Sequence, residues 1–334
     1  MYNLEICNYT KEDNEAALEL ENMCPQGDSI KLRFVRTEFH RRSEVYEKSR
    51  ILCAKHGGKL VGVAACAEKV VTVNGKEIKS VYGYDLRVHP QFRKFGTAKT
   101  LTDAVIKSFG DEIDCNYTFV AAQNERALGF VKRSFGAQVI IPFVYFIIPV
   151  YRKVKSVTMQ NDSAENIHNA FLQHNEKLQF VPQFNKEKLF GYIKSVSHGN
   201  NAGCSIWTNE NLLAEQVVNL PWQSSALSFL QKMIKPFIYT PNIPKKNEIL
   251  KSWFLFDLFA NDEKSLVKMI RSISNCAYEQ GKDYLYVFLQ KDSPMCLMLS
   301  QLPVKMFTLP YYYLSKGKTI PRASDQIYVD IRDL

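Results

Sequence analysis

YDLRVHPQFRKFGTA, residues 84–98, is the stretch of sequence that decides the fold. Leu86 and Val88 alternate with polar residues, as in a strand with one buried face. Beyond Pro90 the period changes, and apolar residues recur at the spacing of one helical face. These helical positions are Ala98, Leu101, Val105, Ile106 and Phe109. The stretch therefore predicts a strand, a short loop and the first turn of an amphipathic helix.

The junction between this strand and this helix is suited to an anion. The first amides of a helix have no internal acceptors, and the helix dipole places partial positive charge there, so a pyrophosphate is stabilised. Gly96 and Ala98 are small enough to leave those amides accessible. Arg93 and Lys94 add side chains that form charge-assisted hydrogen bonds. We expect a phosphate-binding loop at residues 93–98.

Two motifs carry a resemblance to a known family. The loop resembles motif A of the acetyl-CoA-dependent N-acetyltransferase (GNAT) superfamily, Gln/Arg-x-x-Gly-x-Gly/Ala after a strand. Residues 124–137, NERALGFVKRSFGA, resemble motif B, in which Asn124 also suits a helix cap. The resemblance implies acetyl-CoA as cosubstrate, no metal, and a pantetheine arm bonded by Asn124. The implied cofactor-binding residues are Leu86, Arg87, Val88, Arg93, Lys94, Phe95, Gly96, Thr97, Ala98, Asn124 and Val131.

The order of predicted elements agrees with this resemblance. A strand and helices precede a three-stranded meander at residues 51–88, whose second turn is the hairpin signal Asn74-Gly75. Helix, strand, helix and a closing strand pair at residues 138–151 follow. We expect residues 28–50 to form a short helix or a loop. The fold class is α+β, a mixed, mostly antiparallel sheet flanked by helices.

The second half of the chain repeats part of this order. We predict a strand at 252–259, helices at 263–279 and 294–301, and strands at 284–290 and 304–309. This pattern suggests a tandem arrangement, with a GNAT domain at 1–152 and a degenerate GNAT-like domain at 153–334. No glycine-rich loop precedes the helix at 263, which argues against a second cofactor site. The whole chain also resembles plant Hookless-type acetyltransferase-like proteins, through CPQG at 24–27, motif A, PVY at 149–151 and QIYVDIRDL at 326–334.

Composition narrows the function classes. The 334 residues carry a net charge of +9, and the densest basic stretch, residues 36–42, suggests a solvated basic surface. We see no stripe of aromatic and basic residues, which argues against nucleic-acid binding. The longest apolar run, residues 139–150, is too short to cross a membrane. Eight scattered cysteines without a Cys-x-x-Cys pair indicate a reducing compartment, so we expect a cytoplasmic protein.

The catalytic groups are harder to identify from sequence. Acyl transfer to an amine requires a proton acceptor for the ammonium group and a proton donor for the leaving thiolate. The motif B tyrosine of the family aligns with Val131, and the family's common base position falls near Ser80. Tyr82 and Tyr84 share strand parity with Leu86, so either hydroxyl is a candidate acid. As in some two-domain relatives, the carboxylate of Leu334 is a candidate base, and a water chain is the alternative.

Two function classes follow. The first is an N-acetyltransferase that transfers acetyl from acetyl-CoA to a primary amine, either a protein lysine or N-terminus or a small amine. The second is a non-catalytic acetyl-CoA-binding regulator or scaffold, which Val131 and the missing carboxylate favour. Both predict cofactor binding, so acetyl transfer separates them.

Overall fold

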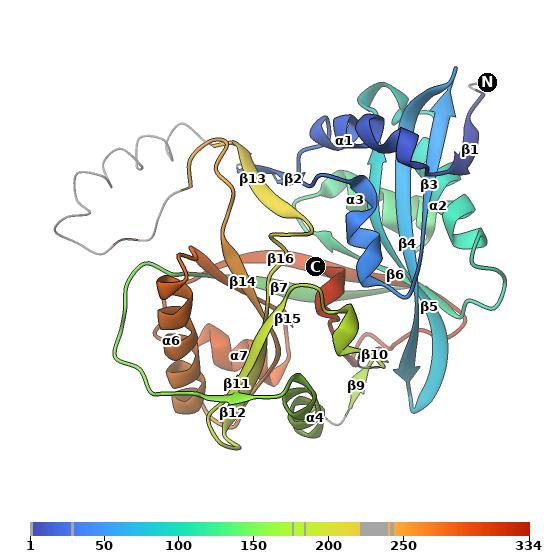
Figure 1. Ribbon diagram of the computed structural model, residues 1–334. Helices are drawn as coiled ribbons and strands as arrows, with labels where there is room; N and C mark the ends of the chain where they lie inside the picture. Colours follow the sequence, from blue (N-terminus) through green and yellow to red (C-terminus); the bar gives the residue numbers. More distant parts are fainter. Residues whose placement is uncertain (1–2, 28–29, 176, 184, 221–239, 241–243) are drawn as a thin grey trace.

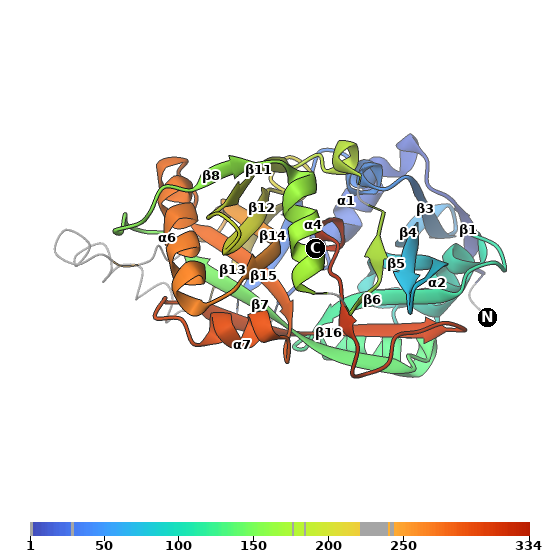
Figure 2. The ribbon, with the colours of Figure 1, turned by 90° about the horizontal axis from the view of Figure 1, so that it is seen from below.

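The computed structural model describes residues 3–27, 30–175, 177–183, 185–220, 240 and 244–334. Most of the strands form one long mixed sheet that runs through both halves of the chain (Figures 1 and 2). Within it β5 pairs with β6 and β14 with β15 in parallel, and the other strand pairs are antiparallel. The predicted α+β fold class is confirmed.

The strands of this sheet follow each other in space in an order that runs from one half to the other. The order is β1 (Glu5–Asn8), β3 (Lys48–His56), β4 (Lys59–Val73), β5 (Lys76–Val88), β6 (Cys115–Ala121), β16 (Phe307–Gly317), β7 (Val139–Pro149), β15 (Tyr284–Gln290), β14 (Ser252–Ala260), β12 (Ala202–Trp207), β11 (Tyr192–Ser197) and β8 (Gln160–Asp162). β10 (Val181–Pro182) pairs with β4. Two small sheets are separate: β2 (Lys31–Val35) with β13 (Ala214–Asn219), and β9 (Leu178–Gln179) with β17 (Gln326–Ile327).

The closing strand of each half lies beside the strands of the other half. β16 pairs with β6, while β7 pairs with β15 and β16. The prediction of a strand pair at 138–151 is therefore wrong, because this run forms the single strand β7. Its side chains are mostly apolar on both faces, as in a strand that lies inside a sheet, and most of them are buried or half-buried. The division of the chain into domains at 1–152 and 153–334 stays a proposal. The main sheet contains strands from both of these ranges.

The described helices flank the sheet, and the sequence predicts all of them except the one at 164–174. They are α1 (Asn14–Asn22), α2 (Thr97–Lys107), α3 (Glu125–Phe130), α4 (Ala164–His174), α6 (Glu263–Glu279) and α7 (Pro294–Ser300). α2 packs on the first-half strands through Leu101 and Val105, whereas α6 and α7 pack on the second-half strands (Figure 1). Among the described residues, none of the helices has the length and apolar character that a membrane span requires.

The prediction of a short helix or a loop at residues 28–50 is confirmed in part, and residues 28 and 29 lie outside the described part of the chain. Residues Phe39–Val45 form a short 3-10 helix, whereas residues 31–35 form the strand β2, which was not predicted. The partner of β2 is β13, which follows about half of the chain later, and Glu215 pairs with Phe34. A local pattern does not reveal a strand whose partner is this distant in sequence. This small sheet extends from the first half toward the second.

Candidate active site

The two parallel strands at the centre of the first half separate beyond their first residues. β5 and β6 are paired only from Ser80 to Tyr82, although both strands continue. A bulge explains part of the separation: Asp85 has φ 49, and the register against β4 shifts between Val63 and Ala65. Bulges of this kind bend a strand away from its neighbour. A V-shaped cleft opens between β5 and β6.

This cleft leads into a large cavity of about 1680 Å³ that residues of both halves line. Thr102 and Val105 of α2 and residues 123–127 before and within α3 form one wall. Seven of the residues predicted for the site lie on the cavity wall: Tyr82, Tyr84, Leu86, Arg87, Asn124, Val131 and Leu334. The remaining seven, Val88, Arg93, Lys94, Phe95, Gly96, Thr97 and Ala98, form the connection from β5 to α2 beside it.

The connection between β5 and α2 has the backbone that the sequence predicts. Gly96 has φ 78, a conformation that favours glycine, and a Cβ built there meets no atom within 4 Å. Open space therefore lies in front of the first helical turn. Arg93 donates from Nε to the carbonyl oxygen of Val88 at 3.0 Å. Thr97 is buried and donates to the carbonyl oxygen of Phe92 at 3.0 Å. These two side chains hold the loop, while Lys94 and Phe95 are exposed.

Motif B has the expected helix cap. The side-chain oxygen of Asn124 accepts a hydrogen bond from the amide of Ala127 at 3.1 Å. The helix that follows Asn124 is α-helical from Glu125 to Phe130, after which Val131–Phe135 forms a π-helical turn that ends at Gly136. π-helical turns frequently occur at functional sites. Val131 is buried on the cavity wall.

The basic stretch at residues 36–42 is not a solvated surface, so that prediction is wrong for two of its arginines. Arg36 is buried and forms ion pairs with Glu21 at 2.7 Å and Asp85 at 2.8 Å. Arg42 lies 3.5 Å from Asp85. Burial raises the pKa of Asp85, but Arg36, Arg42 and Arg87 outweigh burial and hold this pKa well below its usual value. Ion pairs with Glu21 on α1 and Asp85 on β5 hold the side chains of Arg36 and Arg42 away from solvent.

The last residues of the sequence lie inside the first half. Lys69 forms ion pairs with Asp330 at 2.6 Å and with Asp333 at 2.9 Å, all three side chains being nearly inaccessible. Tyr117 donates to Asp333 at 2.8 Å. Arg42 donates to the main-chain oxygens of Asp333 at 3.1 Å and Leu334 at 3.3 Å. Residues 331–333 form a 3-10 turn, which follows the short strand β17. Leu334 is thereby placed on the cavity wall.

The two candidate acids already have hydrogen-bond partners. Tyr82 donates to the carbonyl oxygen of Asp333 at 2.5 Å, and Tyr84 shares a 2.8 Å hydrogen bond with Ser43. Their rings stack at a centroid distance of 5.5 Å. Burial raises the pKa of both hydroxyls above its ordinary value. Both phenols therefore keep their protons at neutral pH.

Glu215 is a residue of this cavity that the sequence reading missed. It lies on β13, and its nearest hydrogen-bond donor is the hydroxyl of Tyr286, at 3.5 Å. Burial raises the pKa of Glu215 to about 7, and the hydrogen bond from Tyr286 lowers it slightly. The one sequence signal is a carboxylate within the strand-like run AEQVVN at 214–219.

The raised pKa of Glu215 predicts that stability depends on pH. The folded state holds this proton more tightly than the unfolded chain, whose pKa is near 4.5. The stabilisation of the folded state by this bound proton is therefore fully present below pH 4.5 and is lost as the pH rises to about 7. We expect Glu215→Gln to be more stable than wild type at pH 8 by up to about 3 kcal/mol, and close to it at pH 4.5. Urea unfolding at both pH values measures the difference; an equal gain at both would contradict it.

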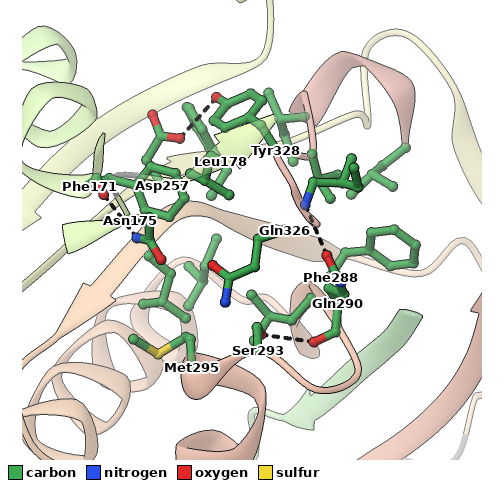
Figure 3. Close-up of a pocket in the computed structure, with 18 residues that line it drawn as sticks. Phe171, Asn175, Leu178, Asp257, Phe288, Gln290, Ser293, Met295, Gln326 and Tyr328 are labelled. Carbon is green, nitrogen blue, oxygen red and sulfur yellow. Dashed lines mark hydrogen bonds between the residues drawn. The ribbon is translucent and has the colours of Figure 1, made fainter. Parts of the chain in front are cut away.

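The pocket at the corresponding pair of strands in the second half is much smaller than the cavity beside β5 and β6. β14 and β15 separate after Leu255, and Asp257 has φ 49, the same value as Asp85. The pocket there has a volume of about 70 Å³ (Figure 3). Asp257 accepts from Tyr328 at 2.9 Å and lies 2.9 Å from Nδ1 of buried His168. These contacts fill the position next to the bulge, and the expectation of a single cofactor site stays a prediction.

Within the described ranges of the chain, one group of side chains brings possible metal ligands together. Glu38, His40 and Glu44 place one ligand atom each within 4.8 Å of the others. His40 lies 3.2 Å from Glu44 and 3.9 Å from Glu38, and Arg41 pairs with Glu44 at 2.8 Å. The pair between Arg41 and Glu44 and the proximity of His40 at an accessible surface account for this arrangement without a metal. The prediction that the chain uses no metal stays untested.

Comparison with known proteins agrees with the geometry of the cleft. Residues 7–137 match the family model described as "Acetyltransferase (GNAT) family". No curated protein sequence is significantly similar to the chain. The likeness to plant Hookless-type proteins stays a prediction.

Solved structures resemble nearly the whole chain. N-myristoyltransferase from Saccharomyces cerevisiae, with bound myristoyl-CoA, is 14% identical, with a TM-score of 0.60 over 95% of this chain and 80% of that one. A putative acetyltransferase from Pyrococcus horikoshii is 12% identical, with a TM-score of 0.53 over 98% of this chain and 96% of that one. A GCN5-related N-acetyltransferase from Kribbella flavida is 10% identical, with a TM-score of 0.50 over 93% of this chain and 71% of that one. At these identities the likeness establishes the fold.

Proposed function

We propose that the chain is an N-acyltransferase of the GNAT family, whose model residues 7–137 match, and that it transfers acetyl from acetyl-CoA to a primary amine. The observation that carries the proposal is the cleft between β5 and β6, which opens beside the start of α2 and leads into a cavity shared by both halves. In this proposal the pyrophosphate is bound at residues 93–98 and the pantetheine arm beside Leu86 and Asn124. A cytoplasmic location and the absence of nucleic-acid partners remain part of the proposal.

The residues near Leu334 supply a route for the proton of the acceptor. A primary ammonium group must lose a proton before its nitrogen attacks the thioester carbonyl. We assign proton acceptance to a carboxylate at Leu334, held by Arg42. The C–N bond then forms, the C–S bond breaks, and the thiolate takes a proton. Tyr82 and Tyr84 line the same cavity and keep their protons at neutral pH, so one of them is the proposed donor.

A glycine added after Leu334 tests this assignment. The addition moves the carboxylate away from Arg42, and general-base catalysis contributes about 100-fold or more to a rate. We expect kcat to fall at least about 100-fold, with an unchanged Kd for acetyl-CoA, because the phosphate loop is not touched. Thiol release with a mixed panel of primary amines measures kcat.

Leu334→Ala is the matched control, since it changes the side chain but keeps the carboxylate in place. This variant should retain kcat within a few-fold. If the chain with the added glycine were as active as wild type, the carboxylate would not be the base, and a water chain would take that role.

The second function class is a non-catalytic acyl-CoA-binding regulator. Val131, in place of the motif B tyrosine, is the observation that favours it. Thiol release separates the two classes, because the regulator binds acetyl-CoA without consuming it. Running the assay with myristoyl-CoA as well as acetyl-CoA also decides the acyl donor.

A further inference from the structure

The part of the cavity that the second-half strands line has an aromatic wall. Adjacent strands β16, β7, β15 and β14 each present an aromatic side chain to one face of the sheet. The pairings Leu309 with Tyr145, Phe288 with Tyr145 and Phe254 with Tyr286 place Tyr311, Tyr145, Tyr286 and Phe254 on that face. Ring centroids are 5.8 Å apart for Tyr145 and Tyr311, 5.0 Å for Tyr145 and Tyr286, and 5.1 Å for Phe254 and Tyr286. All four rings line the cavity.

A single carboxylate lies against this wall. Glu215 is close enough to Tyr145, Tyr286 and Tyr311 that its charge, after burial, raises the pKa of all three hydroxyls. Across the described part of the chain, no Lys, Arg or His nitrogen lies within 4.0 Å of Glu215. The buried carboxylates of the cavity differ, because Asp85 has Arg36 and Asp333 has Lys69. Among the described residues, the partly exposed carboxylate of Glu215 thus has no basic partner, unlike Asp85 and Asp333.

A carboxylate beside aromatic faces is the chemistry that recognises an organic cation. The ring faces attract a cation by their quadrupoles, and the carboxylate supplies the opposite charge. We propose that Glu215 and the wall formed by Tyr145, Tyr286, Tyr311 and Phe254 bind a second cationic group of the acceptor. The acceptor is then an elongated amine, such as a diamine or polyamine, and not a simple monoamine. This inference rests on the proposed function, since it concerns the substrate of the same site.

The sheet sets the distance between the two cationic groups. Tyr82 lies on β5, and β6 and β16 separate that strand from Tyr145 on β7. With neighbouring strands about 4.8 Å apart, three steps across the sheet span about 14 Å. An acceptor whose first amine lies beside Tyr82 and Leu334 therefore needs an extended linker of about this length to bring its second amine to Glu215.

A long acyl chain is the other candidate ligand for the part of the cavity beside the aromatic wall. An alkyl chain there would remove the carboxyl group of Glu215 from water with Tyr286 as its one side-chain hydrogen-bond partner among the described residues, and burying a polar group that is poorly hydrogen-bonded is costly. A cation avoids that cost by pairing with it. The charge at Glu215 therefore favours a cationic acceptor over an acyl chain.

Calorimetric titration of diaminodecane and decylamine tests the proposal without requiring turnover. The two probes have chains of equal length and differ in one terminal amino group. We expect wild type to bind diaminodecane at least about tenfold more tightly, and Glu215→Gln to bind both equally. Glu279→Gln, a charge change at an exposed position outside the cavity, should keep the wild-type preference. Tyr145→Leu, which leaves the carboxylate in place, should weaken diaminodecane binding several-fold.

The outcomes separate this inference from the proposed function. Equal binding of the two probes to folded wild type would overturn the inference, and so would an unchanged preference in Glu215→Gln. Tighter binding of decylamine than of diaminodecane would point to an acyl-chain site instead. If the preference for diaminodecane is present but thiol release is absent with every acyl-CoA, the cation site stands and the acyltransferase proposal fails.

Discussion

Replacing Gly96 with glutamate is expected to abolish acetyl-CoA binding. Gly96 precedes α2, and a side chain added to it extends into open space in front of the helix amides. A carboxylate there competes with the pyrophosphate for those amides and repels its charge. We expect Kd to rise at least about 100-fold, or about 2.7 kcal/mol, in calorimetric titration.

The control for this variant is Gly96→Ala. Position 96 has φ 78, and a non-glycine residue in this conformation lowers the stability by about 1–3 kcal/mol. Both variants therefore carry the same backbone strain. Alanine adds no charge and should weaken binding far less than glutamate. If both variants bound acetyl-CoA equally, whether strongly or not at all, the loop would not be the anion site.

Replacing Lys69 with methionine is expected to cause the largest loss of stability. Lys69 is the cation between Asp330 and Asp333, with 2% of its side chain accessible. Its removal leaves the two carboxylates buried with only Arg332 to pair with Asp330. Breaking a buried ion pair from one side costs about 3–5 kcal/mol, which urea unfolding at neutral pH measures. Turnover should fall as well, because Asp333 and Leu334 are no longer held at the cavity.

Lys48→Met is the matched control, since it removes an ion pair with Glu68 at 2.5 Å from a lysine whose side chain is half exposed. Exposed pairs contribute about 1 kcal/mol or less, so this variant should unfold close to wild type. Equal losses for the two variants would show that the C-terminal residues are not held by a buried network.

Much of the fold follows from local pattern. The predicted helix at 263–279 coincides with α6, because Asp262 caps it by accepting from Ser265 and its apolar face is continuous. The hairpin at Asn74 and Gly75 and the phosphate loop after β5 are local in the same way. Turns, caps and periodicity depend on residues a few positions apart, so the sequence displays them directly.

The features that escaped the sequence reading join residues far apart in the chain. β16 of the second half pairs with β6 of the first half, which places Tyr313 beside Phe119. The residues of neither strand indicate which strand it pairs with. Arg42 is buried because Asp85 and Leu334 lie around it. Glu215 gains its character from three tyrosines that belong to other strands. Pairings at such separations are set by tertiary packing rather than by local propensity.

Hydrogen exchange of the wild-type chain with and without acetyl-CoA tests the central claim, a single acyl-CoA cleft in the first half, most directly. We predict slower exchange in residues 84–98 and 124–131 and little change around the small pocket at Asp257 and Tyr328. Slower exchange confined to the second half, or no change at saturating acetyl-CoA, would contradict the assignment of the cleft between β5 and β6.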